Sequence, residues 1–326
     1  MSIAPQMTIH AQSLPLSRPF RISRGAKTSA DVVVVELTQD GMTGRGECVP
    51  YARYGEDCAS VMAQLEPWQG QAPDRTQLQT LLPAGAARNA LDCALWDLEA
   101  KLSGISVARR IGIALPPLLP TALTVTLDRP AAMAAQALAL GKVGLIKVKV
   151  DAQEPLEQIH AVRQAAPDAR LIVDPNEAWS SDLLARIMPD LVALRVDLLE
   201  QPIPASQSAA LAAMPAQVPI CADEACHTAA DLPALVGRYQ VVNIKLDKAG
   251  GLTEALAMLR AARALGFGVM TGCMTASSLS IAPAMLIGAQ SDFVDLDGAM
   301  LMVEDRPGAM PLRDGQLWPA APGFWG

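Results

Sequence analysis

Short apolar runs recur along the chain from residue 121 onwards, and each run ends in a polar residue. The end residues of successive runs, such as LIVD and LLE, lie 22 to 26 positions apart. A strand, a short loop and a helix fit this period, so the pattern predicts a repeated βα unit. Counted from Thr121–Leu127, it gives eight strands, and we predict a parallel α/β barrel. The end residues are Lys149, Asp174, Glu200, Asp223, Lys245, Thr271 and finally Asp295 and Asp297.

The stretches between these runs have helical patterns. The predicted helices span 131–140, 156–166, 182–188, 205–213, 231–236 and 253–265. No convincing helix follows Asp297, and residues 299–326 have an irregular, proline-containing pattern. Within that last segment, Gly315–Trp318 is predicted to form a strand that returns to the first domain.

Residues 1–117 do not follow the barrel period and predict a separate α+β domain. Val32–Thr38 has the composition of a strand, and a turn at Gln39-Asp40-Gly41 predicts a hairpin with Gly41–Glu47. An apolar stripe predicts a helix over Ala86–Leu102. The prolines of Pro116–Pro120 mark the boundary to the barrel. The predicted segments are domains 1–117 and 118–298, a C-terminal segment 299–326, and two polar lid loops near 15–31 and 49–57.

Composition narrows the classes of function. The chain has 326 residues, of which 51% are hydrophobic and 18% charged, and a net charge of −7 without a basic patch. A nucleic-acid partner is therefore not expected. No run approaches the roughly 18 apolar residues of a membrane span, and the N-terminus lacks a signal pattern, so we expect a cytoplasmic protein. The six scattered cysteines favour reduced thiols, and three histidines without a paired motif argue against zinc.

Three carboxylates at the ends of successive strands form a candidate metal site. Asp174, Glu200 and Asp223 should meet at one face of the barrel, and such oxygen ligands suit Mg²⁺, or alternatively Mn²⁺. An acidic strand end also caps helices or pairs with lysine, but three at the barrel period favour a metal. By strand alternation, Asn176 shares a face with Asp174.

Two glutamates next to these ligands, Glu177 and Glu224, fall on the opposite face by the same alternation. We expect them to support the site from behind or to lie in loops.

Lysines on opposite sides of the barrel form a candidate acid–base pair. Lys147 and Lys149 share one face of their strand. Lys149 and Lys245 come from strands two and six of eight, across the barrel from each other. A cation and apolar walls should lower the pKa of such lysines and make them good bases. Two opposed bases acting on a carbon next to a carboxylate match a racemase or epimerase, with Lys147 as electrostatic support.

The combined motifs resemble the enolase superfamily, and within it the muconate-lactonising subgroup. They are K-x-K at Lys147, D-x-N at Asp174, E-Q-P at Glu200, A-D-E at Asp223 and N-I-K-L-x-K-x-G-G around Lys245, where we expect Lys248 to form a salt bridge. The resemblance covers nearly the whole chain. It implies a (β/α)7β barrel under an N-terminal α+β capping domain that the C-terminal segment completes.

The D-x-D motif at Asp295 and Asp297 resembles the dipeptide epimerases, in which it holds the substrate's ammonium group. This resemblance implies Mg²⁺-dependent epimerisation of dipeptides such as L-Ala-D-Glu and L-Ala-L-Glu, in murein peptide recycling. Arg24 would bind the substrate's Glu side chain, and Thr126 is another expected substrate-binding residue. Lid residues are expected at Tyr51, Arg53 and Tyr54.

Other functions remain open from the sequence. An N-acylamino acid racemase or a cycloisomerase of the same subgroup would not need an ammonium site. A Schiff-base aldolase would need no metal, which the acidic triad argues against, and a scaffold would not explain so many opposed charges. The seventh-strand motif TGCMTASSLS lacks the acidic residue of many subgroup members, which leaves the roles of Cys273, Met274 and Thr275 open. A homo-oligomer is possible, but no interface is predicted.

Overall fold

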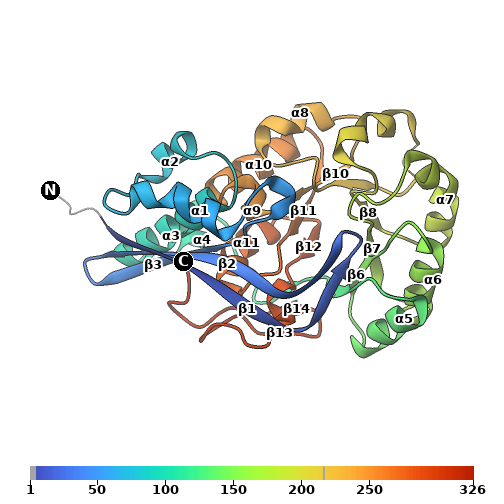
Figure 1. The fold of residues 1–326 in the computed structure, drawn as a ribbon, viewed down its shortest axis with the longest axis horizontal. Coiled ribbons are helices and arrows are strands. Elements are labelled where there is room, and N and C mark those ends of the chain that lie inside the picture. The colour runs from blue at the N-terminus through green and yellow to red at the C-terminus, as the bar shows by residue number, and fades with distance from the viewer. Residues whose placement is uncertain (1–4, 216) are drawn as a thin grey trace.

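A three-stranded antiparallel sheet begins the chain in the computed structural model, which describes residues 5–215 and 217–326 (Figure 1). Asp40 and Gly41 both have positive φ angles, +49° and +75°, as a two-residue hairpin turn requires. The predicted hairpin is thereby confirmed. The strands are β1 (Gln6–Ile22), β2 (Gly25–Gln39) and β3 (Met42–Cys48).

The expected loop over 15–31 is instead the far end of the β1–β2 hairpin, so that prediction was wrong. Phe20 pairs with Lys27 and Ile22 with Gly25, after a register shift that follows Pro15. Most side chains in this stretch are partly or fully exposed. The two strands therefore remain paired through backbone hydrogen bonds over 15–31, although this stretch lacks the alternation of apolar and polar residues by which a strand is recognised.

Helices cover one side of this sheet. Where α3 crosses β3, a Cβ atom on Gly44 or Gly46 would lie only 2.4 Å or 2.0 Å from a backbone oxygen of α3. Only glycine allows this approach, which seals a core between the helix and the sheet. The helices are α1 (Cys58–Leu65), α2 (Arg75–Leu81), α3 (Ala86–Ser103) and α4 (Val107–Ile111), with short 3₁₀ helices η1 (Ala52–Tyr54) and η2 (Glu66–Trp68).

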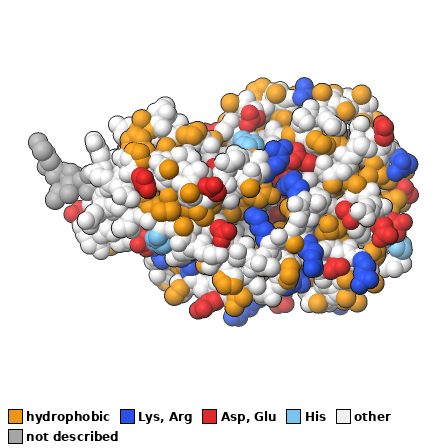
Figure 2. Space-filling view, in the orientation of Figure 1, with side chains coloured by type: hydrophobic (Ala, Val, Ile, Leu, Met, Phe, Trp, Pro, Cys, Tyr) orange, Lys and Arg blue, Asp and Glu red, His pale blue; other side chains and the backbone are white. Residues whose placement is uncertain are grey.

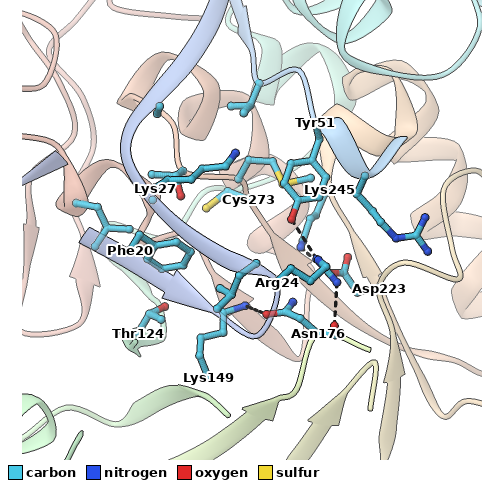
Figure 3. A pocket seen from close by; sticks show the side chains of 18 of the residues that line it. Phe20, Arg24, Lys27, Tyr51, Thr124, Lys149, Asn176, Asp223, Lys245 and Cys273 are labelled. Atoms are coloured by element: carbon cyan, nitrogen blue, oxygen red, sulfur yellow. Dashed lines mark hydrogen bonds and ion pairs between the residues drawn. The ribbon is translucent and has the colours of Figure 1, made fainter. Parts of the chain in front are cut away.

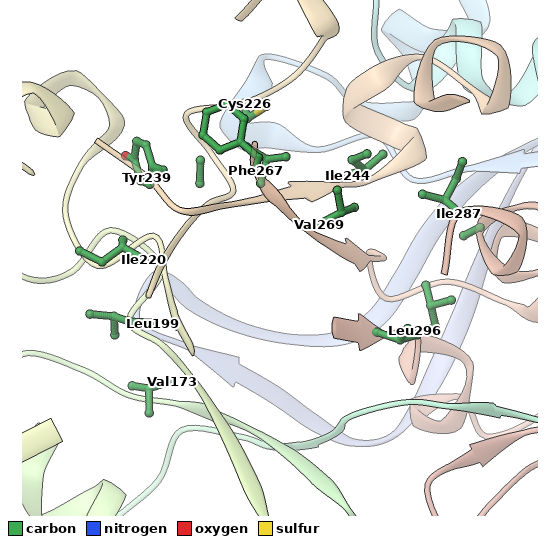
Figure 4. Close-up of a cluster of buried hydrophobic side chains, with 14 of the residues drawn as sticks. Val173, Leu199, Ile220, Cys226, Tyr239, Ile244, Phe267, Val269, Ile287 and Leu296 are labelled. Carbon is green, nitrogen blue, oxygen red and sulfur yellow. The ribbon is translucent and has the colours of Figure 1, made fainter. Parts of the chain in front are cut away.

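Eight parallel strands form the predicted barrel. A bond from the Ala122 amide to the Val294 carbonyl, 2.8 Å long, links the last strand to the segment before the first. Apolar side chains such as Val173, Ile220 and Val269 fill the space between strands and helices (Figure 4). The strands are β5 (Leu123–Val125), β6 (Leu145–Lys149), β7 (Arg170–Asp174), β8 (Leu198–Glu200), β9 (Ile220–Ala222), β10 (Val241–Ile244), β11 (Gly268–Gly272) and β12 (Phe293–Asp295).

Most of the predicted outer helices are present, but the one at 231–236 is a 3₁₀ turn followed by a short helix, and the short helix Leu246–Ala249 was not predicted. Residues 205–213 form a 3₁₀ helix, and Ser278–Gly288 forms a helix that we did not predict. Nearly all residues of that helix are buried, so it lacks the polar face by which a surface helix is recognised. The outer elements are α5 (Pro130–Ala139), α6 (Pro155–Ala165), α7 (Ser181–Ala193), η3 (Ala205–Ala213), η4 (Ala229–Asp231), α8 (Leu232–Leu235), α9 (Leu246–Ala249), α10 (Leu252–Ala264), α11 (Ser278–Gly288) and η5 (Gly298–Leu301).

The C-terminal segment returns to the capping domain, although not through the predicted strand. β14 (Gln316–Leu317) pairs with β13 (Leu312–Arg313) and with β4 (Leu119–Pro120), just ahead of the barrel. The chain end then reaches the capping helices, where the Gly326 amide donates to Asp97 at 2.8 Å. In the part of the chain that the structure describes, no helix has the length and apolar character needed to cross a membrane.

Candidate active site

A cavity of about 480 Å³ lies where the C-terminal ends of the barrel strands meet the capping domain. The β1–β2 hairpin and the segment around Tyr51 form its mouth, and barrel residues form its floor (Figure 3). Charged floor residues are Lys147, Lys149, Asp223, Lys245, Asp295 and Asp297, while Arg24, Lys27, Arg53 and Glu224 belong to the mouth.

The three predicted metal ligands converge under this cavity. Lys147 Nζ lies 3.2 Å from Asp174 Oδ2 and 2.7 Å from Glu200 Oε2. Lys245 Nζ lies 2.7 Å from Asp223 Oδ2 and 4.0 Å from Glu200 Oε1. All three carboxylates are fully or almost fully buried. Two lysines thus connect three carboxylates that come from consecutive strands.

The carboxylates differ in protonation behaviour. Burial, with repulsion from Asp174 and Asp223, raises the pKa of Glu200 to about 7. Burial also acts to raise the pKa of Asp223, but the nearby Lys245 and Lys248 outweigh it and hold that pKa well below its usual range. Of the triad, Glu200 is therefore the carboxylate whose negative charge its surroundings stabilise least.

This donor set fits a hard divalent cation, because it offers only carboxylate oxygens. Within residues 5–215 and 217–326, the acidic groups do not form a ready-made metal cluster. Ammonium groups of Lys147 and Lys245 lie within salt-bridge distance of these carboxylates. A cation binding there would replace contacts that the lysines now make.

The two candidate bases face the cavity from opposite sides. Lys149 belongs to β6 and Lys245 directly follows β10, the second and sixth strands of the barrel sheet. Lys149 Nζ donates to Asp174 Oδ2 at 2.5 Å and to Asn176 Oδ1 at 3.2 Å. Lys245 Nζ donates to Asp223 Oδ2 at 2.7 Å. Asn176 also donates to Asp174, in line with its predicted shared face.

The predicted lowering of the pKa values of Lys149 and Lys245 assumed a bound cation, so it stays a prediction. Burial acts to lower the pKa of Lys245, but Asp223 and Glu200 outweigh it and raise that pKa well above its usual value. Asp295 and Glu200 do the same for Lys147. A divalent cation bound among these carboxylates would act in the opposite direction, because it disfavours the charged form of a nearby lysine.

Two more lysine contacts bear on the predictions. Lys147 Nζ donates to Asp295 Oδ2 at 2.7 Å, so it touches three carboxylates and lies at the centre of the buried charges. Lys248 is almost completely buried and lies 2.7 Å from Asp223 Oδ1, which confirms its predicted salt bridge.

Asp295 and Asp297 both line the cavity. Asp295 Oδ1 is buried and has no hydrogen-bond partner among the described residues. Asp297 Oδ2 accepts the Thr124 amide at 2.7 Å. Burial and repulsion from Asp295 raise the pKa of Asp297 to about 6. The pair is therefore short of positive charge at the cavity wall.

The structure corrects the placement of Thr126. Its hydroxyl donates to Gln136 Oε1 of α5 at 3.0 Å, and it is not among the residues that line the cavity. Thr124 lines the cavity instead. β5 ends at Val125, so Thr126 lies beyond the strand and turns toward the helix.

Arg24 lies at the mouth within a network of polar groups. Its Nη1 lies 2.8 Å from Glu224 Oε1 and 3.4 Å from Glu177 Oε2, and donates to the Asn176 carbonyl at 2.9 Å. Its Nη2 donates to the Tyr51 hydroxyl at 3.0 Å (Figure 3). Arg53 forms two bonds with Glu177, of 3.0 Å and 3.1 Å. We call Arg24, Arg53, Glu177 and Glu224 the mouth network.

The two glutamates of this network were predicted to point away from the site, which was wrong for Glu224. It lines the cavity and contacts Arg24. Strand alternation does not predict the direction of Glu224, because β9 stops at Ala222. Asn176 and Glu177 even have positive φ angles, +48° and +68°.

Other cavity residues escaped prediction. Phe20, Ile22 and Lys27 line the cavity from the hairpin that was taken for a loop. Had the hairpin been recognised, its register would have pointed to Phe20 and Lys27, which are paired across the strands. The sequence itself carries no apolar alternation there that signals pairing.

Comparison with protein families identifies both parts of the chain. Residues 5–112 match the N-terminal domain of mandelate racemase and muconate lactonizing enzyme. Residues 130–324 match the enolase C-terminal domain-like family.

Among curated relatives, an L-Ala-D/L-Glu epimerase from Escherichia coli is 49% identical over 314 residues, which cover 95% of this chain and 98% of that protein. An N-acetyl-D-glutamate racemase from a Pseudoalteromonas species is 43% identical over 300 residues, covering 90% of this chain and 95% of that protein.

Solved structures are also similar. An enolase family member from Agrobacterium tumefaciens with homology to dipeptide epimerases, with bound sodium and L-Ala-L-Glu, superposes with a TM-score of 0.96 at 42% identity, covering 99% of this chain and 100% of that one. A dipeptide epimerase from Enterococcus faecalis, complexed with Mg and L-Leu-L-Tyr, gives a TM-score of 0.91 at 28% identity, covering 100% and 99%.

Proposed function

Because this chain belongs to the enolase superfamily, with the domains of the mandelate racemase and muconate lactonizing enzyme family, we propose that it is a Mg²⁺-dependent dipeptide epimerase. Its proposed substrates are L-Ala-D-Glu and L-Ala-L-Glu. The relative that is 49% identical over 95% of the chain has this activity in its name.

One observation carries the proposal: Lys149 and Lys245 line one cavity from the second and sixth strands of the barrel. A substrate α-carbon held between them has a base on each face. One lysine, as the neutral amine, removes the α-proton, and the other, as the ammonium ion, delivers a proton to the opposite face. The configuration at that carbon is thereby inverted, and the lysines exchange roles in the reverse reaction.

Asp174, Glu200 and Asp223 are the residues that would hold Mg²⁺. Their buried carboxylates and the raised pKa of Glu200 support a site for a cation. When bound, the cation would stabilise the negative charge that develops on the substrate carboxylate as the α-proton leaves. Lys147, which contacts three carboxylates, contributes positive charge to the same region.

The two ends of the dipeptide need different partners. The unpartnered oxygen of Asp295 and the neighbouring Asp297 would bind the free ammonium group. Arg24, whose guanidinium lines the cavity mouth, would donate hydrogen bonds to the Glu side chain. We further propose that the substrates are murein peptides recycled in the cytoplasm. The six cysteines are all free thiols, which supports a reducing compartment.

A second candidate is racemisation of an N-acylated amino acid. It is favoured by the 43% identity with the N-acetyl-D-glutamate racemase. Such substrates lack a free ammonium group, so the two candidates differ in their need for the carboxylate pair at 295 and 297. The buried, unpartnered Asp295 Oδ1 favours the dipeptide.

The proposal is tested by proton NMR of L-Ala-L-Glu and L-Ala-D-Glu in D₂O with enzyme and Mg²⁺. We expect the Glu α-proton signal to disappear while the other diastereomer appears, and EDTA to stop both changes. Turnover of N-acetylglutamate without turnover of either dipeptide would instead establish the second candidate.

A further inference from the structure

Lys27 is a second basic residue of the hairpin at the cavity mouth, and the function proposed above gives it no role. It lies on β2 opposite Phe20 of β1. Its side chain lines the cavity, and its Nζ lies 5.2 Å from the centre of the Tyr51 ring. Figure 3 shows Lys27 near Tyr51 and Cys273, whereas Arg24 lies toward Asn176 and Asp223.

The cations that line the cavity differ in their partners. Arg24 and Arg53 pair with glutamates of the mouth network, and the three floor lysines pair with aspartates or glutamates. Among the cavity cations in the described residues, Lys27 alone has no carboxylate partner. Its contact with the face of Tyr51 is favourable but leaves the ammonium group free to bind an anion.

The charges of the mouth network cancel. Arg24 and Arg53 contribute two positive charges, and Glu177 and Glu224 contribute two negative charges. A second carboxylate that approaches Arg24 would meet the repulsion of Glu224, whose nearest contact with the arginine is 2.8 Å. Arg24 can donate hydrogen bonds to such a group, but the network offers no net positive charge to attract it.

We propose that Lys27 determines the preference of this site for an acidic side chain. Its ammonium group binds the side-chain carboxylate of the residue that is epimerised, and Arg24 orients that carboxylate by hydrogen bonds. The proposal rests on the dipeptide function above and adds the residue that provides the net charge. Figure 2 shows Lys and Arg side chains, with Asp and Glu side chains among them, over the middle of this face, where the hairpin crosses the barrel in Figure 1.

The test compares L-Ala-L-Glu with L-Ala-L-Gln, which has the same shape and no side-chain charge. We expect Lys27→Met to lower the ratio of kcat/KM for Glu over Gln about tenfold, mainly through KM for the Glu dipeptide, because a charge-assisted contact is lost. Lys27→Arg should keep the ratio within about threefold of wild type, since the charge remains. Lys142→Met is the matched control, because Lys142 is an exposed lysine on the loop before β6.

Salt provides an independent measurement. Raising the ionic strength should lower the Glu-to-Gln ratio of the wild type and leave that of Lys27→Met nearly constant, because only the wild type has the exposed charge contact. A ratio in Lys27→Met equal to those of the wild type and Lys142→Met would overturn the inference while leaving the dipeptide function intact. A wild-type enzyme that turns over neither dipeptide would overturn both.

Discussion

The floor and the mouth of the cavity contain the same kinds of ion pair under different physical conditions. On the floor, Lys147 and Asp174 have side chains that are 3% and 0% exposed. At the mouth, the side chain of Arg53 is 44% exposed although it makes two bonds to Glu177. A buried charge without a partner costs several kcal/mol, whereas an exposed pair contributes about 0 to 1 kcal/mol.

This difference explains how the site divides its tasks. A buried lysine charge is costly without a partner, and every floor lysine contacts carboxylates that a cation would also bind. Mouth charges can remain unpaired because water solvates them, and Lys27 is such a case. The proposed function accordingly places the chemistry in the barrel and the selection of the substrate side chain in the capping hairpin.

Removing the cation or one of its ligands should have the largest effect. Glu200→Gln keeps the shape of the side chain, and we expect activity on L-Ala-L-Glu to fall to background, as with EDTA. Titration calorimetry should show Mg²⁺ or Mn²⁺ binding to wild type and to the control Glu99→Gln, whose carboxylate lies outside the site, but not to Glu200→Gln. Epimerisation that survives EDTA would contradict the assignment of the floor.

Replacing one base should cost about 10²- to 10⁴-fold in epimerisation, the usual contribution of a general acid–base group. Each lysine serves one face of the α-carbon. Lys149→Ala and Lys245→Ala should therefore each retain deuterium exchange with only one diastereomer, and the two variants should select opposite diastereomers. Proton NMR in D₂O measures this exchange. Equal exchange of both diastereomers in either variant would rule out the two-base arrangement.

Asp297→Asn tests the proposed ammonium site at Asp295 and Asp297. If Asp297 binds the ammonium group, the change should lower kcat/KM for L-Ala-L-Glu by about 10- to 100-fold. Steady-state assays on N-acetylglutamate should show little change, since this compound has no ammonium group. Equal losses on both compounds would mean that Asp297 acts through its hydrogen bond with the Thr124 amide and not through the substrate.

The same division explains what the sequence predicted. Lys149, Asp174, Glu200, Asp223 and Lys245 end apolar runs at a regular period, because the barrel repeats the same burial pattern at each strand. A parallel barrel then brings strand ends to one face without further information. The floor could therefore be assembled from the pattern alone.

The residues around the cavity mouth could not be predicted in this way, for two physical reasons. Lys27 and Phe20 lie in a hairpin end whose pairing is made by backbone hydrogen bonds, and these leave no alternating pattern in the sequence. Glu224 and Thr126 lie just past strand ends, where side-chain alternation no longer holds. On the floor, the pKa of Lys245 was also beyond the sequence, because it depends on which charges lie next to it and residue spacing does not show them.

The smallest effect is expected from Arg53→Ala, which removes the two bonds to Glu177 at the mouth. The side chain is 44% exposed, so thermal stability should hardly change. KM for L-Ala-L-Glu should rise a few-fold. Glu177 also contacts Arg24, and without Arg53 it would hold Arg24 less firmly in place.

Arg75→Ala is the matched control: Arg75 also makes a two-bond pair, with Glu99, and stacks on Trp96, but it does not line the cavity. That control should lower the melting temperature and leave KM unchanged. A melting temperature that falls in Arg53→Ala as it does in Arg75→Ala would show that the mouth contributes to folding stability, and the contrast between mouth and floor would no longer hold.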